Sequence, residues 1–300
     1  MRTGLIATAL LCLTFALPAA ADSERFSVGT ARLFTNDFFG DGKDRWRTGS
    51  YQVSHFRARG FDGTLPGRAG EVLEFRLRSE IIAAERLSAP EPGDRRYAGV
   101  LGFGIHTPFQ TGGWETSIGV DVLATGPQTG IGSFQATVHE WLDASEPDLD
   151  DQIENGIHPT LIASATRPLT FGDTRVRPFV EMQAGLETFG RAGVDVLIGS
   201  YGAGGLLARD ATTGVPMRAD HRQAAGFSFL LGGDYTVVEH SRLLPADDGY
   251  VVKDRSRVRA GVQWADDQQR IFYGLTYLSE EFEAQREGQI VGSLTVDFAF

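Results

Sequence analysis

The stretch LEFRLRSEI, residues 73–81, alternates two kinds of side chain along its whole length. Its even-numbered positions are all charged, whereas its odd-numbered positions are apolar except for Ser79. Successive side chains of a β-strand point to opposite sides of the sheet, so this pattern predicts a strand with one apolar face and one ionic face. A soluble sandwich would also bury one face of each strand and expose the other, so the alternation by itself leaves a soluble fold and a membrane fold open.

The same alternation recurs along the chain and predicts twelve strands. No segment after residue 21 approaches the roughly 18 to 20 apolar residues that a membrane-spanning helix needs. Bacterial barrels close with an even number of strands and use about 9 to 11 residues per crossing. We therefore expect an all-β fold, a twelve-stranded antiparallel transmembrane β-barrel over residues 22–300. The predicted strands are residues 26–35, 46–58, 70–83, 96–106, 114–124, 158–168, 175–188, 193–202, 224–239, 249–263, 270–282 and 289–300. In the tenth, Arg255, Arg257 and Arg259 are expected to face the lumen and to pair with acidic strand residues.

Residues 1–21 have the features of a signal peptide. Arg2 provides the charged start, residues 5–17 form an apolar core, and alanines precede Asp22. The single cysteine, Cys12, lies in this segment, so the mature chain would lack disulfides, thiol chemistry and cysteine-bound metals. The formal net charge of −11 argues against a nucleic-acid partner. Export together with the barrel pattern predicts localisation in the bacterial outer membrane.

Strand parity predicts which loops face the outside of the cell. The first strand of such barrels begins on the periplasmic side, so the connections after odd-numbered strands face outward, beginning with residues 36–45, 84–95 and 125–157. Long loops in compact proteins are usually functional, which singles out residues 125–157. This loop carries apolar residues at helical spacing, which predicts a short helix over residues 131–142.

Polar residues from separate loops gather at the outward end. Gln135 and His139 would share one face of the predicted helix, and Asn36, Asp37 and Thr48 come from the first loop and the strand after it. An imidazole can act as a general base near neutral pH, and the Asp37 carboxylate can bind a hard cation together with loop carbonyls and water. Such a metal would polarise an ester carbonyl while His139 takes a proton from water. Plainer interpretations stay open, because a histidine on a loop helix is often a packing residue and an Asn-Asp pair often forms a turn.

Short sequence motifs, here called pieces, occur in order along almost all of the mature chain. They are TND at 35–37, DR at 44–45 with TG at 48–49, GDR at 93–95 with YAG at 97–99, GP at 126–127 with Gln135 and His139, DQIEN at 151–155, EF at 281–282 and GSL at 292–294. In these pieces and their order the sequence resembles the outer-membrane lipid A 3-O-deacylases, a family of calcium-dependent twelve-stranded barrels.

The resemblance implies a function and a set of site residues. It implies calcium-dependent hydrolysis of the acyl ester at the 3' position of lipid A. Lipopolysaccharide and the surrounding outer-membrane lipids would be the partners, and the site would lie on the outer wall of the barrel beneath the helical loop. By position, His139 resembles the family's water-activating base and Asp37 its calcium-associated carboxylate, while Asn36 and Thr48 fall on other active-site positions.

Substrate contacts are expected from Gln135, Arg86 and Arg95. The family's second outward loop can carry a Lys-Arg pair that contacts the sugar headgroup, whereas here a glutamate precedes Arg86. An acidic neighbour weakens the attraction for an anionic sugar, so we expect a weaker dependence on inner-core anionic sugars. Two alternatives remain. One is a non-catalytic outer-membrane pore or structural barrel, and the other is a serine-dependent phospholipase, which Trp141 disfavours because those enzymes carry a serine two residues after the histidine.

Overall fold

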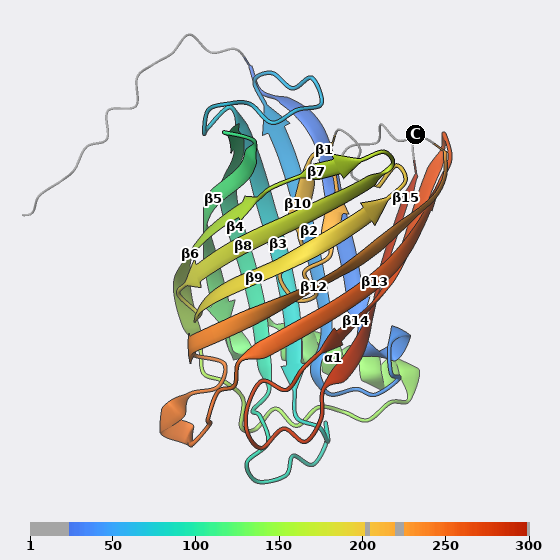
Figure 1. Ribbon diagram of the computed structural model, residues 1–300. Coiled ribbons are helices and arrows are strands. Elements are labelled where there is room, and N and C mark those ends of the chain that lie inside the picture. Colours follow the sequence, from blue (N-terminus) through green and yellow to red (C-terminus); the bar gives the residue numbers. More distant parts are fainter. Residues whose placement is uncertain (1–23, 202–204, 220–224, 299–300) are drawn as a thin grey trace, which may run out of the picture.

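The computed structural model describes residues 24–201, 205–219 and 225–298, so the predicted signal peptide of residues 1–21, with Cys12, lies outside the described residues. The barrel strands are β1 (Phe26–Asn36), β2 (Trp46–Ala58), β3 (Val72–Ala83), β4 (Ala98–Thr111), β5 (Trp114–Thr125), β6 (Gly156–Thr166), β8 (Thr174–Ala184), β9 (Glu187–Ile198), β12 (Gly226–Ser241), β13 (Arg255–Ala265), β14 (Gln269–Leu278) and β15 (Gln289–Phe298). They pair antiparallel in chain order, and β1 closes the barrel by pairing with β15 (Figure 1). The remaining strand of this sheet, β7 (Leu169–Phe171), pairs with β8 at the turn that precedes it. The predicted twelve-stranded antiparallel β-barrel is confirmed.

The ionic face of the strands points into the barrel and the apolar face points out. On β3, Glu74 and Glu80 are buried, whereas Leu77 on the opposite face is about half exposed. On β13, Arg259 is buried and the neighbouring Val258 is exposed. A soluble sandwich buries its apolar face instead, so this orientation decides between the two folds that the alternation left open: the wall is suited to contact lipid. Within the described residues, no helix is both long and apolar enough to span a membrane.

Ion pairs fill much of the lumen. Arg259 pairs at 2.6 Å with both Asp195 of β9 and Asp234 of β12. Arg255 and Arg257 also pair with acidic residues of other strands, as expected from the sequence. A buried charge is tolerated when it is paired and hydrogen-bonded, which is why the inward faces carry acids and arginines together.

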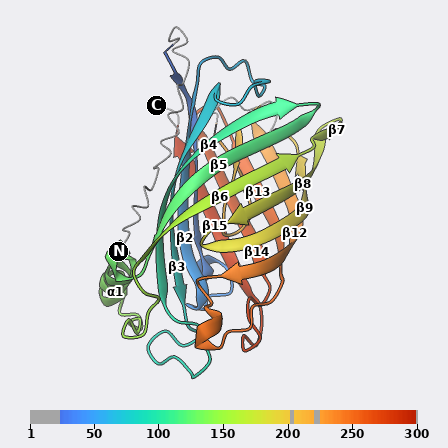
Figure 2. The ribbon, with the colours of Figure 1, turned by 90° about the vertical axis from the view of Figure 1, so that its left-hand side faces the viewer.

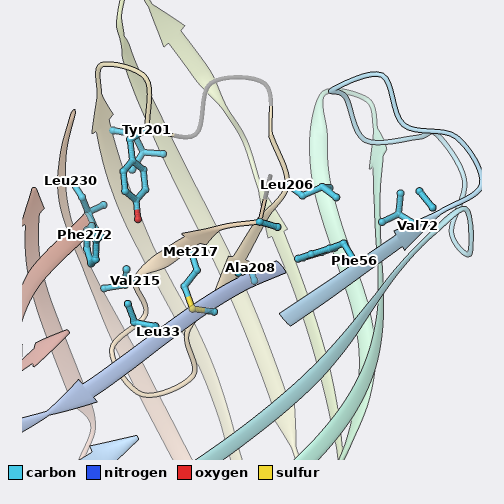
Figure 3. Close-up of a cluster of buried hydrophobic side chains, with 14 residues drawn as sticks. Leu33, Phe56, Val72, Tyr201, Leu206, Ala208, Val215, Met217, Leu230 and Phe272 are labelled. Carbon is cyan, nitrogen blue, oxygen red and sulfur yellow. The ribbon is translucent and has the colours of Figure 1, made fainter. Parts of the chain in front are cut away.

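A short hairpin lies inside the barrel. Its strands, β10 (Leu207–Arg209) and β11 (Pro216–Arg218), belong to the connection between β9 and β12. The side-chain amide of Gln52 on β2 donates to the carbonyl oxygen of Arg209 at 3.1 Å. The apolar cluster in Figure 3 joins the hairpin to the wall and includes Leu33, Phe56, Ala208, Val215, Met217 and Phe272. Because the hairpin occupies the lumen, the packing does not favour an open pore.

The expectation of strands at 175–188 and 193–202 is wrong in its boundaries. β8 already ends at Ala184 and β9 already begins at Glu187. The tight turn between them depends on Gly185, whose φ is 156° and where a Cβ would lie 2.3 Å from the hydroxyl oxygen of Thr160. Leu186 in this turn is buried, so the apolar alternation continues through it and hides it. The strands of the inner hairpin, with three residues each, are too short to show any alternation.

One end of the barrel carries the helical segments. They are η1 (Asp37–Phe39), η2 (Pro127–Thr129), α1 (Ile131–Leu142) and η3 (Ala246–Asp248) (Figure 1). These segments follow β1, β5 and β12, which are the first, fifth and ninth strands of the barrel. The predicted helix over residues 131–142 is therefore confirmed. It lies outside the barrel wall, beside β3 and β4 (Figure 2). Gly99 on β4 permits this close approach, because a Cβ there would lie 2.7 Å from the Cβ atom of Ile131.

Candidate active site

The first outward loop places a buried carboxyl group beside the start of β2. Asn36 ends β1, and its side-chain oxygen accepts a hydrogen bond from the backbone N–H of Phe38 at 2.8 Å, so the Asn-Asp pair does form a turn. Asp37 is only 1% exposed. Its Oδ2 accepts from the backbone N–H of Arg45 at 2.9 Å, and its Oδ1 accepts from the hydroxyl of Thr48 at 3.2 Å. The register shift of β2 between Trp46 and Gly49 lies at the position from which Thr48 reaches this carboxyl group.

His139 approaches the same loop from α1. Its Nδ1 lies 2.5 Å from the carbonyl oxygen of Ser145, and a carbonyl only accepts, so Nδ1 carries a hydrogen. The neutral ring then has its lone pair on Nε2. That atom lies 3.2 Å from Oδ2 of Asp44 and 3.5 Å from the side-chain nitrogen of Gln135. This arrangement suits a general base, because the ring is held by one nitrogen and can accept a proton on the other.

Asp44 connects the histidine to the buried carboxyl group. Its Oδ1 accepts a short hydrogen bond from the hydroxyl of Thr48, and its Oδ2 faces His139. Together with the contact between Thr48 and Asp37, this makes a continuous polar chain from α1 to η1. The structure thus brings together Asp37, Thr48, Gln135 and His139, four of the residues predicted from sequence. Asp44 was not among them, although it stands in the DR piece at 44–45, four residues before Thr48.

Burial gives Asp37 an unusual titration. Removal from water, together with the smaller effect of the nearby carboxyl groups of Asp44 and Asp41, raises the pKa of the Asp37 carboxyl to about 8. The hydrogen bonds from Arg45 and Thr48 oppose this shift and are outweighed. A carboxyl group in such a place favours either a proton or a cation as its neighbour.

The available donor atoms suit a hard cation such as calcium. The Thr48 hydroxyl has a single hydrogen, yet carboxyl oxygens of both Asp37 and Asp44 lie within its reach. Buried Gln135 adds an amide oxygen that has no hydrogen-bond partner among the described residues. Oxygen atoms of this kind are the ligands that calcium prefers. Within the described part of the chain, no group of three or more His, Cys, Asp and Glu side chains is arranged to hold a metal. A cation here would therefore need amide, carbonyl or water oxygens beside the carboxylates.

The predicted residues of the second loop lie apart from this chain of contacts. Arg95 is buried and pairs with Glu281, and no contact joins it to His139 within the described residues. Direct contact between Arg95 and a lipid outside the wall is therefore not supported, since its loop turns the side chain inward. Arg86 is exposed and lies 3.3 Å from Glu91 in its own loop. The carboxylate of Asp94 accepts from the backbone N–H of Arg95 and so orders the loop.

Comparison with known proteins places the chain in a family. Residues 5–300 match the family described as "Outer membrane protein LpxR". Among solved structures, LpxR from Salmonella typhimurium superposes with a TM-score of 0.72 at 17% identity, covering 91% of this chain and 100% of that one. The β domain of the Bordetella autotransporter BrkA gives a TM-score of 0.46 at 11% identity, covering 91% of this chain and 99% of that one. No curated protein matches. Because the family match spans nearly the whole sequence and the barrel closes as in the Salmonella protein, this outer-membrane chain belongs to the LpxR family, the lipid A 3-O-deacylases that its sequence resembles.

Proposed function

We propose that this protein hydrolyses the 3'-O-linked acyl ester of lipid A in the outer leaflet and requires calcium. The observation that carries the proposal is the arrangement of His139, whose Nδ1 is held by the Ser145 carbonyl while Nε2 faces Asp44. This base lies on a helix outside the barrel wall, where an acyl chain is reached from the membrane (Figure 2). Membership of the LpxR family supports lipid A as the substrate.

His139 would activate water. Its Nε2 takes a proton from a water molecule whose oxygen attacks the ester carbonyl carbon. The bond between that carbon and the sugar oxygen then breaks, and the imidazolium returns the proton to the sugar oxygen. The products are a free fatty acid and a 3'-hydroxyl group. Asp44 would pair with the imidazolium between these two proton transfers, because its Oδ2 lies 3.2 Å from Nε2.

A side-chain donor in the first outward loop would stabilise the charge that develops on the ester oxygen. The side-chain oxygen of Asn36 accepts a hydrogen bond from the backbone N–H of Phe38, so the NH₂ group of Asn36 is directed away from Phe38 and can donate to another group. This NH₂ group lies close to Gly49 of β2, where a Cβ would be 3.3 Å from its nitrogen. We assign Asn36 as an oxyanion donor and Thr48 as the residue that positions Asp37 and Asp44. Calcium held by Asp37, with Asp44 nearby, would supply positive charge for the ester carbonyl.

Mass spectrometry of lipid A tests the proposal. The purified protein is reconstituted with lipid A and calcium, and we expect a mass loss equal to the 3'-linked acyl chain. A His139→Gln variant should give no loss, whereas His158→Gln should behave as the native protein, because the His158 ring hydrogen-bonds to Thr125 on the neighbouring strand and not to the residues around His139. Loss of an acyl chain from another position of lipid A would contradict the proposal, and so would the absence of any mass loss with the native protein. Conductance measured in a planar bilayer with the same protein separates a hydrolase from a pore.

A further inference from the structure

The amphipathic helix α1 does not pack its apolar side against the barrel. Beyond Ile131 at the helix start, which packs against Gly99, the residues that face the protein are Gly132, Gln135 and His139, which are buried or largely buried. By contrast, Phe134 is 63% exposed and Trp141 is 77% exposed. The helix therefore has a polar and small-residue side toward the wall and leaves its largest apolar side chains uncovered.

Helical geometry separates three sides of α1. Each residue advances about 100° around the helix axis, so Phe134 and Trp141, seven residues apart, lie on one side. We call these two residues, with Val138 between them, the apolar flank. Ser133 and Glu140 are likewise seven residues apart and lie on a different side, about 100° further round. An exposed apolar flank next to an exposed polar flank is typical of a helix that lies in a membrane interface.

The apolar flank continues the lipid-facing surface of the barrel. α1 stands outside the wall beside β3 and β4 (Figure 2). The outward side chains of these strands include exposed Leu77 and Phe103. Contiguous exposed apolar surface marks contact with lipid or protein, and here it adjoins the wall that faces lipid.

The neighbouring loop adds aromatic residues to the same surface. Phe38 of η1 is 75% exposed and lies edge-on to Phe39, with ring centroids 5.7 Å apart. Phe39 in turn packs edge-on against Phe34, an outward residue of β1, at 6.1 Å. The hydroxyl of Tyr273 on β14 donates to the carbonyl of Phe39 at 2.7 Å and so ties this aromatic group to the wall. Aromatic side chains are enriched in barrels at the boundary between the apolar band and the polar headgroups.

We infer that α1 is an interfacial helix whose apolar flank inserts among the acyl chains of the outer leaflet, with Ser133 and Glu140 on the headgroup side. The partner is the acyl region of the surrounding lipid, and the inference does not require that the protein hydrolyses anything. Such helices bury their apolar side about 5–10 Å into the boundary between headgroups and acyl chains. His139 would then be held at the depth where ester bonds of a lipid lie.

Site-directed spin labelling measures this insertion directly. The mature chain is expected to lack cysteine, so one introduced cysteine gives one label. Four variants are prepared, Phe134→Cys and Trp141→Cys on the apolar flank and Ser133→Cys and Glu140→Cys as matched controls on the same helix. Each is reconstituted in palmitoyl-oleoyl phosphatidylcholine vesicles after its heat-modifiable migration on a gel confirms a folded barrel. Collision rates are then measured with oxygen, which concentrates in the acyl region, and with a water-soluble nickel chelate.

The expected result is an oxygen-to-nickel collision ratio several-fold higher at positions 134 and 141 than at 133 and 140. Equal ratios at all four positions, or nickel access at 134 and 141 matching that of a water-exposed site, would overturn the inference. Low access to both reagents at 141 with dipolar broadening would assign the flank to a second copy of the chain and also overturn it. Brominated lipids provide a second measurement on the mature protein without an introduced cysteine. These lipids should quench the tryptophan fluorescence of this protein more strongly than that of a Trp141→Phe variant. Equal quenching of the two proteins would count against insertion.

Discussion

Asp44 offers the sharpest test of the site, because its charge is placed against His139 and it was not predicted from sequence. The Asp44→Asn change keeps the shape of the side chain and removes the charge at 3.2 Å from Nε2. Two unit charges about 4 Å apart interact by about 1 kcal/mol in water and about 4 kcal/mol at an effective dielectric constant of 20. The Asp44 side chain is 38% exposed, so solvent screening places the loss near the lower limit, at about 1–2 kcal/mol. We expect kcat/KM for ester release to fall about 5- to 30-fold.

A double-mutant cycle with saturating calcium separates this effect from a loss of metal binding. If Asp44 acts through the imidazole, Asp44→Asn should cause no further loss in a His139→Ala background. Asp44→Glu should recover part of the activity, and Asp247→Asn, at an exposed position of η3 at the same end, serves as the matched control. Losses that simply multiply in the double variant, or equal losses in Asp44→Asn and Asp247→Asn, would refute the proposed coupling.

Four further outcomes are expected. His139→Ala should lower turnover by about 100-fold or more with the barrel still folded, whereas His158→Ala should change it little; equal losses would show that the effect of His139 is not catalytic. Chelation should abolish ester release and calcium should restore it, and full activity in excess chelator would exclude the metal role of Asp37. Because burial raises the pKa of Asp37 to about 8, its carboxyl holds a proton below that pH, so calcium affinity measured by calorimetry should rise with pH by up to about tenfold per unit and level off above about pH 8; a constant affinity between pH 6 and pH 8 would contradict this. Since Arg86 is engaged by Glu91, hydrolysis of lipid A with inner-core acidic sugars should exceed that of lipid A without them by less than about tenfold, or about 1.4 kcal/mol; a larger preference that fades with added salt would show that another basic residue supplies the contact.

Local pattern was enough to predict the barrel and the helix. A strand has a period of two residues, so the charged and apolar positions of residues 73–81 revealed its two faces without any knowledge of neighbouring strands. The helix over residues 131–142 was equally visible, because its apolar residues follow the helical period. The turn at Gly185 escaped this reasoning, since buried Leu186 continues the apolar alternation across it.

The composition of the site was only partly visible in the sequence. Asn36, Asp37, Thr48, Gln135 and His139 were predicted by residue type and resemblance, and four of them lie in one chain of contacts. Their connection through Asp44 depends on where α1 docks, and that docking depends on a close approach at Gly99 that no periodicity encodes.

Tertiary structure alone decided which acidic residue each inward arginine meets. The predicted barrel already implied that the ionic side of each strand faces the lumen, but only the closed barrel shows that Arg259 meets Asp195 and Asp234 there. The same closure and loop packing bury Arg95 against Glu281, although its sequence position suggested a contact with the substrate. The physical reason is that secondary structure follows from interactions within a few residues. The partner of a charged side chain, by contrast, is set by contacts between residues far apart in the chain, in this case 186 positions.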